Sequence, residues 1–327
     1  MTVDANPPTV SILIPAHNAE RFIEETLVSV LSQTFADFEC LVINDGSTDR
    51  TADIVEKFLA DPRLRLINLA KVGLCGALNH GISLCRASLI ARMDADDVML
   101  PERLAVQVAF MESEPEIAGC SSDFWLINET GLCIGEVRCP LISVDAIQKH
   151  LRAGGQLIYS HGTVMYRRET VLELGGYRNE YFPCEDVDLF VRMLDIGKPL
   201  LNLSTSLIKV RVHPASVSSN SAIRQFYTNK LIFRNLAARR RGQPDVDIDQ
   251  YFSGINSAVG LRKLLARLEV ASFVLHRKAA REKTNKRRIL GHSLLVAAIV
   301  LNPYDAYKKM VRRLLNRVDR DRLRSAK

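Results

Sequence analysis

Several features that would assign a protein class at once are missing from this sequence. The seven cysteines are scattered and include no CxxC pair, so neither a zinc ribbon nor a disulfide framework is indicated. The longest uncharged run in the C-terminal third, residues 289–304, has 16 residues, whereas a membrane-spanning helix needs about 20 apolar ones. The first residues lack a basic segment followed by an apolar one, which is not typical of a secretory signal. We therefore expect a cytoplasmic protein without a spanning helix.

Charge is distributed unevenly along the 327 residues. From residue 261 onward, 19 lysines and arginines face 5 acidic residues, so this segment carries +14 and the first 260 residues carry −7. Such a segment favours an anionic partner, although a solvated helical face would look the same. Nucleic acid is disfavoured because the basic residues lack interleaved aromatic side chains. An amphipathic basic pattern around Met310 instead favours peripheral binding to an anionic membrane surface.

Strand-like and helix-like segments alternate over the first 110 residues. We predict strands at 9–14, 38–43, 63–69 and 88–93, separated by helices at 19–32, from about 47 to 60 and at 73–85, and followed by a helix from Pro101. This alternation predicts βαβ units and a mostly parallel sheet covered by helices.

The later part of the chain is less regular. Strand-like pieces at 119–127, 162–166 and 210–213, and a helix at 184–196, suggest a mixed-sheet half. From residue 221 the pattern is helical, with breaks near Gly242 and at Asn302-Pro303. We predict one domain over residues 1–220 and a basic helical region over 221–327.

Polar turns follow three of the predicted strands, at residues 15–18, 44–47 and 94–97. Ligands of parallel sheets bind beyond the carboxyl ends of the strands, so these turns are candidate site residues. Asp94, Asp96 and Asp97 would repel one another unless a cation neutralised them, which makes them a candidate Mg²⁺ or Mn²⁺ site, although acidic turns without a metal are also common. Asp45 could accept a hydrogen bond from a base N–H or a ribose hydroxyl, or act only as a turn or capping residue.

A second acidic pair, Glu185 and Asp186, begins the predicted helix at 184–196. A carboxylate in the first turn of a helix is held rigidly, and the helix N-terminus favours its ionised form. Such a group could remove a proton from an attacking hydroxyl. The alternative is that both acids merely complement the helix dipole.

Six motifs occur in a characteristic order: SILIPAHNAERFIEETLVSVLSQTFADFECLVINDGSTDRT, KVGLCGALNHGI, ARMDADDVMLPERL, HGT, GGYR and EDVDL. The chain thereby resembles the glycosyltransferases of family two, over residues 9–110 and again at 161–163, 175–178 and 185–189. The resemblance implies the GT-A fold, a Rossmann-like α/β fold with a mixed, mostly parallel sheet flanked by helices. It also implies a metal-dependent, inverting transferase that moves a sugar from a nucleoside-diphosphate donor, UDP by preference, to an acceptor hydroxyl in cell-surface polysaccharide or glycolipid synthesis.

The resemblance assigns roles by position. It implies a donor site formed by Pro15, Ala16, His17, Asn18, Glu20, Asp45, Lys71, Gly73, Asn79, Asp94, Ala95 and Asp96. It implies Mn²⁺ or Mg²⁺ on Asp96, with Asp94 nearer the ribose and His213 as a further ligand. Asp186 corresponds to the catalytic base, while Arg211, His161 and Glu185 are expected near the diphosphate or the acceptor.

Two departures narrow these expectations. His17 stands where many relatives have an aromatic residue. In addition, no Gln-x-x-Arg-Trp motif occurs, and its absence disfavours a processive synthase. A polyprenyl-phosphate glycosyl synthase stays an alternative, and the acceptor is expected to be a saccharide or a lipid-linked molecule.

Other classes fit less well. A nucleotidyltransferase would need a glycine-rich basic loop after the first strand, which is missing. A glycosidase would not need the nucleotide-binding edge, and a non-catalytic nucleotide-sugar binder would not need Asp186.

Overall fold

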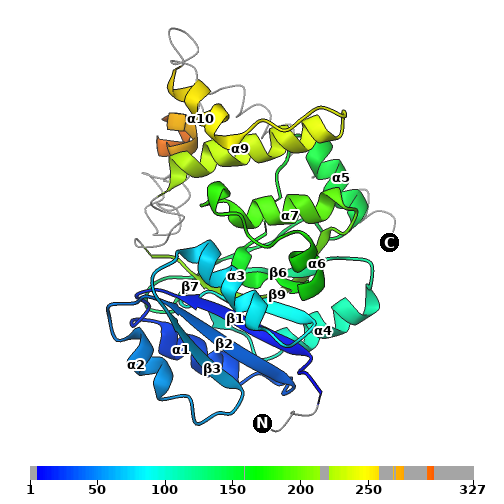
Figure 1. Ribbon diagram of the computed structural model, residues 1–327. Coiled ribbons are helices and arrows are strands. Elements are labelled where there is room, and N and C mark those ends of the chain that lie inside the picture. Colours follow the sequence, from blue (N-terminus) through cyan, green and yellow to red (C-terminus); the bar gives the residue numbers. More distant parts are fainter. Residues whose placement is uncertain are drawn as a thin grey trace. The chain divides into compact units, whose positions relative to one another are not determined.

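The computed structural model describes residues 6–157, 159–213, 221–257, 268, 270–275 and 293–297. The chain divides into two compact units, one of Met1–Ser219 with Ile232–Gln243 and the other of Asn220–Leu231 with Pro244–Lys327 (Figure 1). The predicted break at Asn302-Pro303 and the amphipathic pattern around Met310 lie outside the described residues. Among the described helices, none combines the length and apolar character that crossing a bilayer requires.

One sheet forms the centre of the first unit. Its nine strands are β1 (Val10–Ala16), β2 (Phe38–Asp45), β3 (Leu64–Leu69), β4 (Leu89–Arg92), β5 (Val98–Met99), β6 (Gly119–Ile127), β7 (Cys133–Val137), β8 (Met165–Arg167) and β9 (Leu200–Arg211). They run in the order β3-β2-β1-β4-β8-β6-β9-β5, and β7 pairs with β6. The first four are parallel, β8 is antiparallel to β4 and β6, and β6 is parallel to β9. The predicted mixed, mostly parallel sheet is therefore confirmed.

Helices and short turns connect these strands. In the first unit they are α1 (Ile23–Leu31), α2 (Thr51–Glu56), α3 (Leu74–Leu84), α4 (Arg103–Ser113), α5 (Val144–Arg152), η1 (His161–Thr163), α6 (Arg168–Glu173), η2 (Asn179–Tyr181) and α7 (Glu185–Asp195). Beyond them, α9 spans Ala222–Arg239 and α10 spans Ile248–Asn256. Helix α3 packs directly on β1 and β2. A Cβ on Gly81 would lie 2.3 Å from Leu13 Cδ1, so only glycine allows this close approach.

The central strands bury both of their faces. All seven residues of β1 and all eight of β2 are buried, as expected for parallel strands with helices on each side of the sheet. The parallel register pairs Ala16 with Asn44, and Asp45 with Leu69. The polar turns that follow β1 and β2 therefore begin at the same edge of the sheet.

The main difference from the sequence prediction is the length of β9. The prediction included only residues 210–213, whereas the strand begins at Leu200. Its middle, Ser204 to Ser206, is polar and partly exposed, and the pairing with β6 shifts register beside it. Polar residues at an irregular register hide the alternation by which a strand is found in sequence.

Candidate active site

Hydrogen bonds join the turn after β1 to the turn after β2. The Asn18 N–H donates to Ser47 Oγ at 3.0 Å, and Asn18 Oδ1 accepts from the Thr48 N–H at 2.8 Å. The Glu20 carboxylate accepts from the Arg50 N–H and Nε, both at 3.2 Å. Asn18 and Glu20, both predicted in the donor site, thus hold the two turns together.

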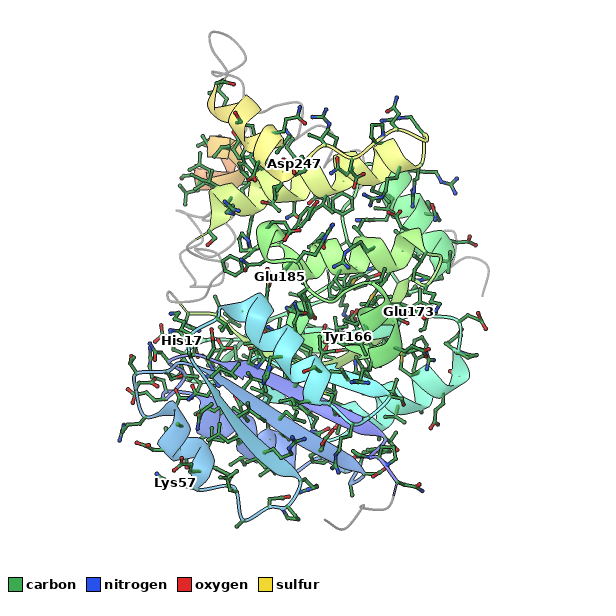
Figure 2. All side chains as sticks on the ribbon, in the orientation of Figure 1. His17, Lys57, Tyr166, Glu173, Glu185 and Asp247 are labelled. Carbon is green, nitrogen blue, oxygen red and sulfur yellow. The ribbon has the colours of Figure 1, made fainter. Side chains whose placement is uncertain are left out.

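His17, Asp45 and Lys71 meet at this edge, where Figure 2 labels His17. His17 Nδ1 lies 2.8 Å from the Asp45 carbonyl oxygen, an acceptor, so this nitrogen carries the hydrogen. His17 Nε2 therefore accepts from Lys71 Nζ, 2.7 Å away. Pro15 and Ala16 end β1 beneath them with buried side chains.

Asp45 fixes the segment that leads into α3. It is 5% exposed, and its carboxylate oxygens accept from the Val72 N–H at 2.6 Å and the Gly73 N–H at 3.0 Å. Each oxygen keeps a second lone pair for a ligand. The Asp45 carboxylate therefore does not cap α2, the helix that follows it in the chain, because both of its donors lie just before α3.

Three carboxylates converge after β4. One oxygen each from Asp94, Asp96 and Asp97 lies within 4.8 Å of the others, around the buried Ala95. Asp97 is 1% exposed; its Oδ1 accepts from the Arg211 N–H at 2.8 Å, while its Oδ2 has no hydrogen-bond partner. Burial and the neighbouring acids raise the pKa of Asp97 well above its usual range.

His213 joins this cluster from the residues just after β9. Its Nε2 lies 2.7 Å from Asp96 Oδ2, and its ring lies 5.4 Å from that of Phe22. Crowded carboxylate oxygens, one of them unpaired and buried, together with an imidazole nitrogen form a donor set that suits Mg²⁺ or Mn²⁺. Asp94, Asp96 and His213 therefore fit the predicted metal site.

The Arg211 side chain is engaged in structural contacts around the carboxylate cluster. It is 4% exposed, and its Nε donates to the Asp96 carbonyl oxygen at 2.8 Å. Its Nη2 donates to the Glu25 carboxylate at 2.5 Å, and its Nη1 donates to the Asn128 carbonyl oxygen at 3.2 Å. These contacts tie the turn after β4 to α1 and to the β6–β7 turn, so we do not propose Arg211 as a diphosphate ligand.

The second acidic pair begins α7, where Figure 2 labels Glu185. Glu185 is 4% exposed, and its Oε2 has no hydrogen-bond partner. Burial, followed by the charge of Asp186, raises the pKa of Glu185 to about 8. Burial also raises the pKa of Asp186 to about 6, against the opposing effects of the Val187 N–H and the Arg92 charge. The charge of Asp94 acts on Asp186 as well, so the two acidic groups are near enough to interact electrostatically.

A buried ion-pair network holds the start of α7. Asp188 is 3% exposed and accepts from Nε of Arg178 and from Nε of Arg192, both at 2.9 Å. Arg192 also donates to the Leu174 and Gly176 carbonyl oxygens at 2.7 Å. The sequence analysis missed this network, although the i,i+4 spacing of Asp188 and Arg192 was a usable signal.

Asn79 and His161 both contact Tyr177. The Asn79 side chain donates to the Tyr177 carbonyl oxygen and accepts from its N–H, each at 2.8 Å, so it fixes residues 175–178 against α3. His161 Nε2 lies 2.7 Å from the Tyr177 hydroxyl oxygen. Burial, and then the charge of Arg92, lower the pKa of His161 well below its usual value, so its imidazole is neutral at neutral pH.

Comparison with known proteins agrees with this geometry. A family model described as Glycosyl transferase family 2 matches residues 11–175. The chain belongs to glycosyltransferase family 2. Among relatives of this family-2 chain, the O-antigen biosynthesis glycosyltransferase WbnJ of Escherichia coli is 32% identical over 65% of the chain and 83% of the relative. The putative glycosyltransferase EpsE of Bacillus subtilis is 34% identical over 62% and 73%.

Solved structures of similar fold include glycosyltransferases with bound donor nucleotides. S. aureus TarS in complex with UDP-GlcNAc has a TM-score of 0.59 at 19% identity, covering 93% of this chain and 92% of TarS. The mannosyltransferase PcManGT of Pyrobaculum calidifontis, in complex with GDP-Man and Mn²⁺, has a TM-score of 0.56 at 18% identity, covering 92% and 88%. At this identity the likeness concerns the fold alone, and the predicted GT-A fold is confirmed.

Proposed function

We propose that this glycosyltransferase moves a sugar from a nucleoside-diphosphate donor to an acceptor hydroxyl and inverts the anomeric configuration. The preferred donor is a UDP-sugar. The reaction belongs to the synthesis of O-antigen or another cell-surface polysaccharide. The observation that supports the proposal is that Asp186 interacts electrostatically with Asp94, one of the three clustered carboxylates after β4. Relatives named for O-antigen synthesis, and one from E. coli named as a UDP-Glc-dependent β-1,3-glucosyltransferase acting on a diphosphoundecaprenol-linked sugar, support the pathway and the donor.

Asp186 would act as the base. Its carboxylate accepts the proton of the acceptor hydroxyl as that oxygen attacks the anomeric carbon. A bond from the acceptor oxygen to this carbon forms while the bond to the diphosphate oxygen breaks, so attack from the opposite face inverts the configuration. The half-buried position of Asp186 in the first turn of α7 holds the base rigidly for this step.

The donor would be held by the edge of the sheet. Asp45 can accept from a base N–H with its free lone pairs, while Lys71 and His17 line the same edge. A divalent ion bound by Asp96, with Asp94 and His213 beside it, would neutralise charge on the leaving diphosphate. Glu185 and His161, near Asp186 and Tyr177, are proposed to contact the acceptor.

The donor is identified by screening nucleotide sugars with and without Mn²⁺ or Mg²⁺. We expect one UDP-sugar to raise the melting temperature and to be hydrolysed slowly to UDP when the metal is present. Release of pyrophosphate from a nucleoside triphosphate in the presence of a sugar phosphate would indicate a nucleotidyltransferase instead. No stabilisation and no hydrolysis with any donor would contradict the proposal.

The pH dependence of transfer follows from the raised pKa of Asp186, about 6. Only the ionised carboxylate can accept a proton, so we expect kcat to be level near pH 7.5 and to fall about tenfold per pH unit below pH 6. The measurement is kcat at saturating donor between pH 5 and 8. A kcat that stays constant down to pH 5 would be inconsistent with Asp186 as the base.

An anionic membrane surface stays a proposed partner on the charge of residues 261–327 alone. Sedimentation of the full chain with anionic liposomes at low salt tests it, and a protein left in the supernatant would end this proposal.

A further inference from the structure

Arg92 is a buried cation at the centre of the acidic site. It is the last residue of β4 and is 2% exposed. Its guanidinium forms an ion pair with the Asp94 carboxylate, and its Nε has no hydrogen-bond partner. A buried charge is costly unless opposite charges surround it. Arg92 is therefore placed by the carboxylates around it rather than by hydrogen bonds to the backbone.

Gly162 leaves the space in which these charges meet. A Cβ on Gly162 would lie 2.9 Å from Asp94 Oδ2, 2.9 Å from Asp97 Oδ2 and 3.4 Å from Arg92 Nη1. A side chain at this position would therefore force at least one of these charged groups to shift. Gly162 belongs to the HGT motif but has no role in the donor and acceptor assignments. These close contacts give a steric reason for a glycine at this position.

We propose that Arg92 is a positioning residue for donor binding: in the space that Gly162 leaves, its guanidinium holds the Asp94 carboxylate by an ion pair and aims it toward the donor. The inference rests on the proposed place of Asp94 in the donor site. It assigns to Arg92 an effect on donor binding rather than on the chemical step.

The test compares Arg92→Met, Arg92→Gln and Arg92→Lys by kcat and donor KM with metal present. Loss of a group that orients a metal ligand typically weakens binding or activity about 10–100-fold. We therefore expect donor KM to rise about 10–100-fold in the Met and Gln variants while kcat changes less. The Lys variant keeps the charge but loses the planar fork, so its donor KM should rise less than in the neutral variants.

Arg86→Met is the matched control. Arg86 also pairs with a buried carboxylate, Glu39, but it precedes β4, at the opposite end of the strand from the site. We expect this variant to keep the unmodified donor KM even if its melting temperature falls. A neutral Arg92 variant that keeps the unmodified donor KM, or that loses kcat alone, overturns the inference, whereas absence of metal-dependent donor binding in the unmodified enzyme contradicts the proposed donor site instead.

If neither neutral variant folds, Gly162→Ala decides the question. It keeps the Arg92 side chain, while its Cβ would lie 2.9 Å from Asp94 Oδ2 and so crowd the ion pair. We expect a raised donor KM with a folded protein, as judged by its melting temperature. An unchanged donor KM in Gly162→Ala overturns the inference.

Discussion

Asp186→Asn is expected to lower kcat by about 10²–10⁴-fold, the usual contribution of a general base, while donor binding in the presence of metal is retained. The amide has nearly the same shape as the carboxylate but cannot take up the proton of the acceptor hydroxyl. The start of α7 should keep its place, because Asp188 and its two arginines hold it. The measurement combines turnover with donor affinity from the thermal shift.

Asp195→Asn is the matched control for this prediction. Asp195 ends the same helix and pairs with Arg239, away from the acidic site. We expect it to leave kcat within a small factor of the unmodified value. Equal transfer by Asp186→Asn and by the unmodified enzyme would remove Asp186 from the role of base.

Asp96→Ala should abolish metal-dependent donor binding. Loss of a group behind a metal ligand typically weakens binding about 10–100-fold, so loss of a direct ligand should cost at least about 100-fold. His213, 2.7 Å from the Asp96 carboxylate, would lose its partner as well. Donor affinity is measured by titration in Mn²⁺ and again in EDTA.

The contrast between these two conditions makes the result specific. In the unmodified enzyme EDTA should weaken donor binding, whereas in Asp96→Ala the two conditions should give the same weak affinity. Asp37→Ala, at the amino-terminal edge of the sheet where Asp37 accepts from Thr9, should behave like the unmodified enzyme. Metal-dependent binding that persists in Asp96→Ala would place the ion elsewhere.

Much of the first half of the fold could be predicted from local pattern. Continuous apolar runs mark β1 and β2, because strands buried on both faces need no polar positions. Helical spacing and Pro101 mark the helices between and after them. The carboxylates after β4 and the acidic start of α7 were also visible, since their positions follow from where a strand ends or a helix begins.

The roles of several site residues could not be predicted in this way. Asn18, Glu20 and Asn79 were assigned to the donor site by position, but the structure engages their side chains in contacts between neighbouring loops. Arg211 was assigned to the diphosphate, yet its guanidinium is satisfied by groups 83 and 186 residues away in the chain. Such partners depend on tertiary packing, which a local pattern does not contain.

The sequence by itself determined the family, the parallel half of the sheet and the acidic residues that we propose to carry the chemistry, because these depend on periodicity and on short motifs. Only the tertiary structure decided how a buried charge is balanced: Arg92 pairs with Asp94 in the space left by Gly162, from a strand and a turn about seventy residues apart. The physical reason is that the free energy of a buried charge depends on its distance from other charges in space, and that distance is set by the fold.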